Sequence, residues 1–98
     1  MVKLWRLMIE VSVKPDDIPN SNTLGFINVV TWADAVDTAK RKVAKYLESF
    51  EWSVLEFEDT HIVDRNLTYG DEMADMIDHA SSNPEAIILG TFHSYEVN

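Results

Sequence analysis

Apolar and polar positions alternate along residues 4–13, the stretch LWRLMIEVSV. Every second residue from Trp5 to Val13 is apolar, whereas the positions between them include Arg6 and Glu10. A period of two places successive side chains on opposite sides of a strand. The pattern therefore predicts a strand with one core face and one face of mixed character.

Three further segments of the chain have strand character. Residues 14–25 contain two prolines and end in glycine, so they predict a long loop, after which residues 25–30 predict a second strand that pairs antiparallel with the first. Residues 51–59 predict a third strand, whose apolar positions change phase, so we expect either a bulge near Val54–Leu55 or a strand covered on both faces. Residues 84–97 predict the last strand, which contains a continuous apolar run from Ala86 to Leu89.

Two segments have a helical period instead. Thr31 is a candidate N-cap for a helix that extends to about Phe50, and residues 71–81 predict a second helix. Each helix has one apolar stripe. The first stripe comprises Trp32, Val36, Ala39, Val43, Leu47 and Phe50, and the second comprises Met73, Met76, Ile77 and Ala80.

The element order is therefore β-β-α-β-α-β, in a single α+β domain over residues 1–98. Because each helix has only one apolar stripe, we expect both helices to cover one face of the sheet. The result is a two-layer sandwich with a four-stranded mixed or antiparallel sheet. It resembles the general style of ferredoxin-like folds, an architectural likeness that implies no function.

Charge and composition narrow the classes of partner. The net charge is −9, and it is unevenly placed: residues 1–50 net +1 and residues 51–98 net −10. This charge argues against nucleic acid as the main target, because phosphate contacts need Lys and Arg. The acidic half is either a solvated surface or a face that meets a basic partner.

The absence of cysteine excludes a disulfide framework, a thiolate nucleophile and a zinc site built on sulfur. Arg6 and Glu10 interrupt the first apolar run, so we expect no secretory signal. No apolar stretch approaches the roughly 18 residues that a membrane span needs. The sequence thus predicts a cytoplasmic protein that does not enter a membrane.

The densest cluster of potential metal ligands is DEMADMIDH, residues 71–79. On a helical wheel, Asp71, Asp75 and Asp78 fall opposite the apolar stripe, and His79 also falls outside it. A metal site needs ligands that converge in a cleft, so we interpret these residues as a solvated helix face and expect no metal and no cofactor. Weak binding of a hard divalent ion between Asp75 and His79 stays open as the alternative.

The remaining candidates for chemistry lie in the last strand. His93 and Tyr95 share its phase with Leu89, which places them where the core gives way to the rim. They are candidate ligand-binding residues, although two amphipathic side chains finishing a strand would look the same. No nucleophile motif, phosphate loop or dinucleotide motif is present, so no catalytic residue is identified. Gly90 permits close approach by a helix, another backbone or a ligand.

The second sheet face remains to be explained. We expect an apolar centre with a polar rim there, as at an interface, formed by Met8, Trp52, Ile88 and Phe92. The favoured function is a non-enzymatic protein-interaction module that self-associates as a homodimer, binds a basic protein, or both. The alternative is a small enzyme or small-molecule binder, with a site between the 14–25 loop and the strand end at His93 and Tyr95.

Overall fold

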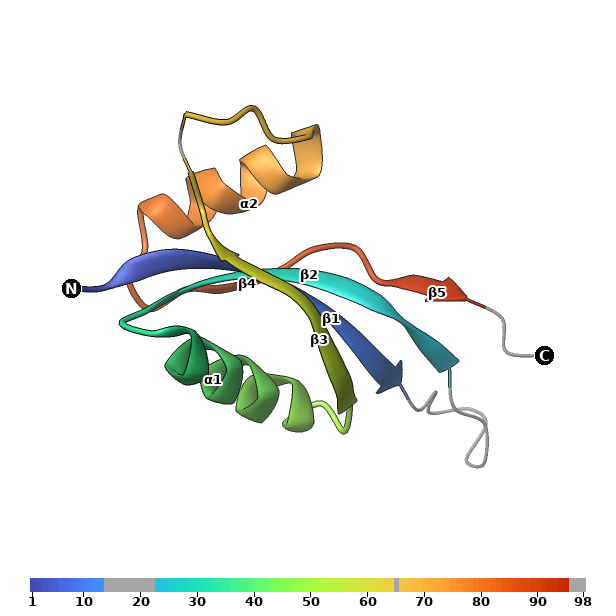
Figure 1. Ribbon diagram of the computed structural model, residues 1–98. Helices are drawn as coiled ribbons and strands as arrows, with labels where there is room; N and C mark the ends of the chain where they lie inside the picture. The colour runs from blue at the N-terminus through green and yellow to red at the C-terminus, as the bar shows by residue number, and fades with distance from the viewer. Residues whose placement is uncertain (14–22, 65, 96–98) are drawn as a thin grey trace.

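An antiparallel sheet forms the centre of the computed structural model, which describes residues 1–13, 23–64 and 66–95. Within these ranges the elements are β1 (Lys3–Val13), β2 (Thr23–Ala33), α1 (Val36–Glu48), β3 (Ser53–Ile62), α2 (Asp71–Ser81), β4 (Ile87–Leu89) and β5 (His93–Tyr95). The strand order is β3-β1-β2-β4, and β5 also pairs with β2 (Figure 1). The predicted α+β class and element order are confirmed.

Strands β1 and β2 pair along their whole length, from Lys3 opposite Ala33 to Val13 opposite Thr23. The alternation in β2 continues beyond the predicted strand end, because Thr31 and Ala33 are also buried on the core side. The prediction that Thr31 caps a helix is therefore wrong. Its hydroxyl donates a hydrogen bond of 2.9 Å to the carbonyl oxygen of Ala86 instead.

Helix α1 accordingly begins later than predicted, at Val36, and its N-cap Ala35 offers no side-chain hydrogen bond. The helix ends at Glu48, so Phe50 lies outside the apolar stripe and is 48% exposed. The start of this helix lacks the side-chain cap that helices commonly have. Its stability therefore depends on the packing of its apolar stripe against the sheet.

The two helices lie on opposite faces of the sheet, so the prediction that both cover one face is wrong (Figure 1). Helix α1 packs on the face formed by residues such as Leu7 and Val29, whereas α2 packs on the face formed by Leu4 and Val30. The physical reason is that the second face is also apolar at one end. The molecule therefore has three layers at that end and two elsewhere.

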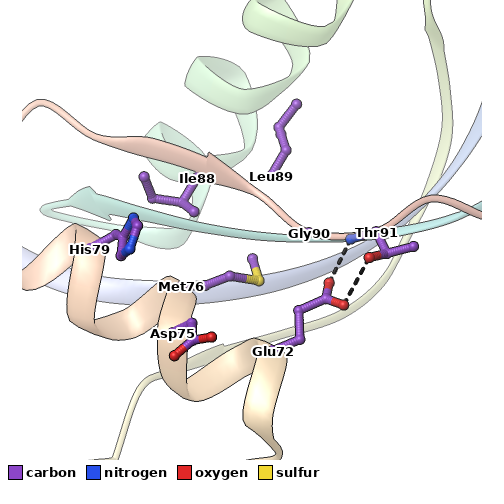
Figure 2. Close-up of a pocket in the computed structure, with 8 residues that line it drawn as sticks. All are labelled: Glu72, Asp75, Met76, His79, Ile88, Leu89, Gly90 and Thr91. Atoms are coloured by element: carbon purple, nitrogen blue, oxygen red, sulfur yellow. Dashed lines mark hydrogen bonds between the residues drawn. The ribbon is translucent and has the colours of Figure 1, made fainter.

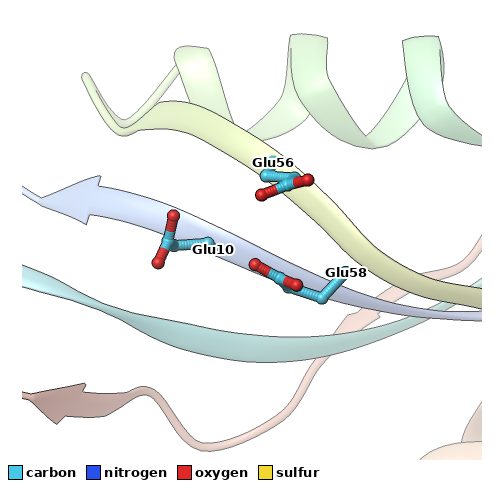
Figure 3. A group of neighbouring side chains, drawn as sticks. All are labelled: Glu10, Glu56 and Glu58. Carbon is cyan, nitrogen blue, oxygen red and sulfur yellow. The ribbon is translucent and has the colours of Figure 1, made fainter.

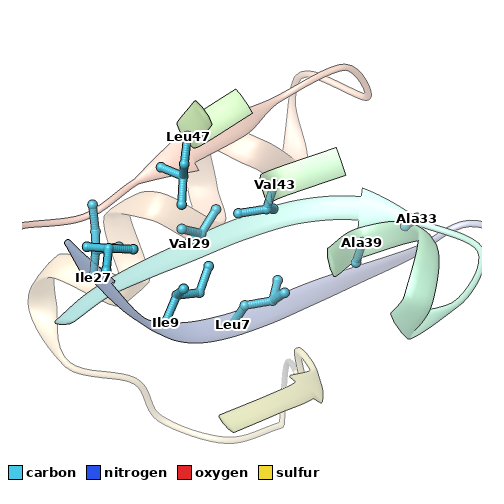
Figure 4. Packing of buried hydrophobic residues seen from close by; sticks show 9 residues of the cluster. Leu7, Ile9, Ile27, Val29, Ala33, Ala39, Val43 and Leu47 are labelled. Carbon is cyan, nitrogen blue, oxygen red and sulfur yellow. The ribbon is translucent and has the colours of Figure 1, made fainter. Parts of the chain in front are cut away.

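The core on the α1 side is continuous and aliphatic (Figure 4). Its buried members come from β1, β2 and α1: Leu7, Ile9, Val11, Ile27, Val29, Ala33, Ala39, Val43 and Leu47. Most of these side chains have no exposed surface at all. Burial of apolar area at this density is the main source of folding free energy in a chain of this size.

Helix α2 buries the predicted stripe, with Met76, Ile77 and Ala80 inside and Met73 half-buried. At the end of this stripe, the indole N–H of Trp32 donates to the carbonyl oxygen of Ala80 at 2.8 Å. Trp32 therefore belongs to β2 and to the α2 side, and not to the first helix as predicted.

The opposite side of α2 faces solvent, as the helical wheel predicts. Asp71, Asp75, Asp78 and His79 are all exposed. The predicted exposure of these four side chains is therefore confirmed, whereas Glu72 of the same stretch accepts hydrogen bonds from Thr91.

Strand β3 is an edge strand with two irregularities in its pairing with β1. Asp59 lies opposite Met8 and Phe57 opposite Ile9, which leaves Glu58 as an extra residue between them. A second shift leaves Leu55 extra in the same way. The predicted bulge near Val54–Leu55 is confirmed, and it brings Val54 and Phe57 to the same side of the sheet.

The last strand is interrupted, contrary to the prediction of one continuous strand. Residues 90–92 separate β4 from β5, and the ring of Phe92 crosses Gly25 toward the α1 side. A Cβ on Gly25 would lie only 2.6 Å from that ring. Phe92 then packs beside Trp52, with ring centroids 5.7 Å apart.

Candidate functional site

Helix α2 packs over β2 and β4 and leaves the rest of its sheet face without a helix (Figure 1). We call this uncovered area the open face. Cross-strand pairing places on it Arg6, Met8, Glu10, Phe26, Asn28, Glu56, Asp59, His61, His93 and Tyr95, with the bulged Glu58 beside them. An uncovered sheet face with this many charged and aromatic side chains is a candidate binding surface.

Three glutamates gather on the open face, toward the end away from Arg6 (Figure 3). Glu10 lies directly opposite Glu56, and the bulge in β3 brings Glu58 beside both. One carboxylate oxygen from each lies within 4.8 Å of the others. No lysine or arginine in the described ranges forms a salt bridge with any of the three. Among the described residues, the cluster is therefore an uncompensated negative charge.

The environment of Glu58 reflects this crowding. Partial desolvation raises the pKa of Glu58 above its usual value, and the charges of Glu56 and Glu10 raise it further. A cation placed among the three carboxylates would reverse this effect, because it would favour their ionised forms.

Carboxylate oxygens are ligands for hard cations such as Ca²⁺. In the described part of the chain, these three glutamates are the one group of three or more His, Asp or Glu side chains close enough to share an ion. Asp71, Asp75 and His79 do not converge in this way, which agrees with their interpretation as a solvated face.

Tyr95, predicted as a ligand-binding residue, forms a hydrogen bond with one member of the acidic cluster. Its hydroxyl donates a hydrogen bond of 2.6 Å to Glu10 Oε2, and its ring packs against Phe26 with centroids 5.3 Å apart. The hydrogen bond to Glu10 raises the pKa of Tyr95, and desolvation and the charge of Glu10 add to the effect. This hydrogen bond links β5 to β1 and fixes the position of the Glu10 carboxylate.

His93, the other predicted ligand-binding residue, lies on the same face in a different environment. It pairs across the sheet with Phe26 and lines a cavity of about 310 Å³ beside the start of α2. Arg6 and Asn28 line the same cavity, whereas Tyr95 is not among its lining residues. The structure therefore places the predicted pair on one face but in separate sites.

Arg6 carries the positive charge of the open face, at the end nearest α2. Its guanidinium lies 3.6 Å from Asp59 Oδ2 and donates to Asn28 Oδ1 at 3.4 Å. His61 Nδ1 lies 3.7 Å from the same carboxylate oxygen of Asp59. On the open face, the negative charge of Asp59 is thus balanced near α2, whereas the opposite end carries the three glutamates.

The four residues predicted to form an interface do not share a surface, so that premise is wrong. Met8 lies on the open face, and Ile88 packs beneath α2. Trp52 and Phe92 pack against the α1 side. The irregularities in β3 and at residues 90–92 change which side each strand presents, and alternation alone does not show this. Self-association stays a prediction, without these residues as its basis.

Sequence reasoning missed the glutamate cluster. The signal for it was present, since Glu56 and Glu58 follow the predicted bulge and Glu10 lies on the mixed face of the first strand. Bringing them together required the register between β1 and β3. Of the predicted site beside the 14–25 loop, residues 14–22 lie outside the described residues, and residues 23–25 begin β2.

Comparisons with protein-family models, with curated proteins and with solved structures found no match to this chain. Neither helix in the described ranges is long and apolar enough to cross a membrane. Any functional conclusion must therefore come from the geometry of the surface itself.

Proposed function

We propose that this protein is a non-enzymatic binding module whose open face engages a basic surface of a partner protein. The observation that carries the proposal is the cluster of Glu10, Glu56 and Glu58 on an uncovered sheet face, with no salt bridge to any of the three within the described ranges. A lysine or arginine of the partner inserted among these carboxylates would relieve their repulsion and form charge-assisted hydrogen bonds. The cytoplasmic location predicted from the sequence fits this role and stays a prediction.

The surroundings of the cluster support contact with a protein. Phe26 and Tyr95 form an aromatic pair beside the glutamates, and the half-buried Met8 adds apolar area. Aromatic residues and methionine are enriched in protein interfaces, where they supply contact area next to polar groups. Charge complementarity then sets the association rate and the choice of partner.

The test compares two triple variants with the same change in net charge. The first is Glu10→Gln, Glu56→Gln and Glu58→Gln. The control removes three exposed acids elsewhere, through Glu48→Gln, Asp78→Asn and Glu85→Gln. Each protein is immobilised and exposed to a cell extract, and bound proteins are eluted by raising NaCl from about 0.1 M to about 0.5 M, which shortens the Debye length.

We expect the wild type and the control variant to retain the same basic proteins and to release them at raised salt. The open-face variant should retain none of them. Equal retention by all three proteins would contradict the proposal, because overall acidity would then explain the binding. Sedimentation of the same samples tests the predicted homodimer independently.

A second candidate function has its own observation. The cavity lined by His93, Arg6 and Asn28 also has the carboxylates of Asp71 and Glu72 in its wall, so it offers charges of both signs in one concave site. A small zwitterionic molecule is the ligand that this set would bind. If so, His93→Ala should abolish binding of the molecule while leaving the fold unchanged, as followed by amide chemical shifts.

A further inference from the structure

Strand β4 presents an unpaired edge. The sheet order ends at β4, and no described strand pairs with its outer side. The amide of Gly90 donates to the carbonyl oxygen of Asn28 at 2.8 Å, which marks Gly90 as facing β2. Because antiparallel pairs alternate, Leu89 and Ile87 direct their amide and carbonyl groups away from β2. Such an edge can accept another strand.

Helix α2 runs beside this edge and forms a groove with it (Figure 2). The groove has a volume of about 460 Å³ and is lined by residues 88–91 together with four residues of α2: Glu72, Asp75, Met76 and His79. Met76 and Ile88 give it an apolar floor, and Figure 2 shows the Met76 side chain pointing toward the strand. Glu72 and Asp75 supply negative charge at its wall.

Glu72 shows how this edge binds a hydrogen-bond acceptor. Its carboxylate accepts from the Thr91 amide at 2.5 Å and from the Thr91 hydroxyl at 2.8 Å. Gly90 makes this approach possible, because a Cβ there would collide with Glu72 and come within 3.0 Å of the Met76 sulfur. The bonds from Thr91 lower the pKa of Glu72, so the end of the groove keeps its negative charge.

We propose that the groove between β4 and α2 binds an extended basic peptide segment, which adds to β4 as a further strand. The outward backbone groups of Ile87 and Leu89 supply the main-chain hydrogen bonds. Alternate side chains of the peptide face α2, so that one apolar residue lies on Met76 and a lysine or arginine two positions away meets Glu72 and Asp75. This site is separate from the open face and does not depend on the function proposed for it.

Charge favours a foreign basic segment over a second copy of this chain. Two copies paired symmetrically through β4 would bring Glu72 and Asp75 of each close to those of the other. Pairing with the β3 edge of another copy would add Glu56, Glu58 and Asp59 to the same groove. Like charges juxtaposed across an interface disfavour both arrangements.

The probe is a synthetic peptide of about eight residues with the repeat Val-Thr-Lys-Thr, which places valine and lysine two positions apart on one face of an added strand. A second peptide of the same sequence carries N-methyl groups on alternate amides, so it keeps the charge and loses the hydrogen bonds of one edge. Two protein variants provide the matched pair. Asp75→Lys reverses a charge at the groove, and Asp78→Lys makes the same change on the same helix, at a cavity formed with Val63 and Leu67.

We expect the plain peptide to bind the wild type and Asp78→Lys with similar affinity, and to bind Asp75→Lys about tenfold more weakly. The N-methylated peptide should not bind. Amide exchange at Ile87 and Leu89 should slow when the plain peptide is added. Equal binding of both peptides, or of both variants, would overturn the proposal.

Two further outcomes are informative. Shifts at Glu56 and Glu58 with none at Leu89 would place the peptide on the open face, which overturns the groove and leaves the proposed function standing. Slow exchange at Leu89 in a free protein that sediments as a dimer would show a second copy on the edge, which also overturns the proposal. The triple glutamine variant of the open face should bind the peptide in the groove as the wild type does.

Discussion

The two faces of the sheet use the same strands for different purposes. On the α1 side, Leu7, Ile9 and Val11 form an unbroken buried row in β1. On the other side, the same strand passes from the buried Leu4 to the half-buried Arg6 and Glu10. A strand can therefore support a closed core on one side while its other side changes, partway along, from a helix-packing surface to a binding surface.

The two faces should differ most in how much stability is lost when a side chain is truncated on each, and the loss should be larger on the α1 side. Leu47→Ala should lower the free energy of unfolding by about 3 kcal/mol, because a fully buried leucine leaves a cavity. Met8→Ala on the open face should cost less than about 1 kcal/mol, since its half-buried side chain leaves no enclosed space. Chemical denaturation of both variants measures the difference. Similar losses would mean that the open face is covered.

Substitutions at two glycines compare how tightly residues 90–93 pack on each face of the sheet. Gly25→Ala should cost about 2 kcal/mol, because the new Cβ meets the His93 carbonyl oxygen at 2.5 Å and the Phe92 ring. Gly90→Ala should cost about 1 kcal/mol, because the atoms it meets first are the flexible ends of Glu72 and Met76. Denaturant midpoints give the order. A larger loss at Gly90 would show that the contact with α2 is the more rigid one.

A smaller effect separates the charges of the open face from the core. The folded-state pKa of Glu58 lies above its ordinary value of 4.5. Its protonated form therefore favours folding, and this stability is lost as pH rises through the raised pKa. Glu58→Gln should unfold at a higher temperature than the wild type at pH 7, and the difference should vanish below pH 4.5.

The matched control for Glu58 is Glu85→Gln, an exposed acid away from the cluster. Its melting temperature should stay close to that of the wild type at both pH values, because substitutions at exposed sites without such contacts have small effects. If Glu58→Gln behaves like the control, the three glutamates do not interact in solution.

The smallest expected effect is a titration shift. Difference spectra between the wild type and Tyr95→Phe isolate the phenolate signal of Tyr95, whose pKa should lie above 10.0. Glu10→Gln should lower it, because the acceptor loses its charge. The stability linked to the protonated phenol is present below the ordinary pKa and is lost as pH rises through the raised one. If the pKa of Tyr95 is the same in Glu10→Gln as in the wild type, the hydrogen bond from Tyr95 to Glu10 is absent in solution.

The sequence predicted those elements whose pattern is local. The alternation in residues 4–13 and the stripe from Met73 to Ala80 both correspond to elements in the structure. Thr31 was misleading because a β-branched residue suits a strand as well as an N-cap. The placement of the helices could not be predicted from their own stripes, since it depends on the apolar positions Leu4, Val30 and Trp32 on the second face.

The candidate sites were harder to predict because they depend on register. Glu10 and Glu56 are far apart in the chain, and only the paired strands with their extra residues bring Glu58 to them. His93 and Tyr95 share a face, but it is the face opposite Leu89 and not the predicted one, because residues 90–92 interrupt the strand. Alternation also could not show that Tyr95 bonds to Glu10 while His93 lines a cavity. Side-chain contacts between distant segments leave no periodic signal.

The two bulges in β3 also affect how the protein behaves when it is concentrated. Fibril growth requires flat strands that stack in register at every step. The extra residues Glu58 and Leu55 twist and shorten the regular stretch of this edge, and its acidic side chains repel a copy of itself. Deleting Leu55 would straighten part of the strand and expose a longer regular template. The bulges therefore protect this side of the molecule from amyloid-like assembly.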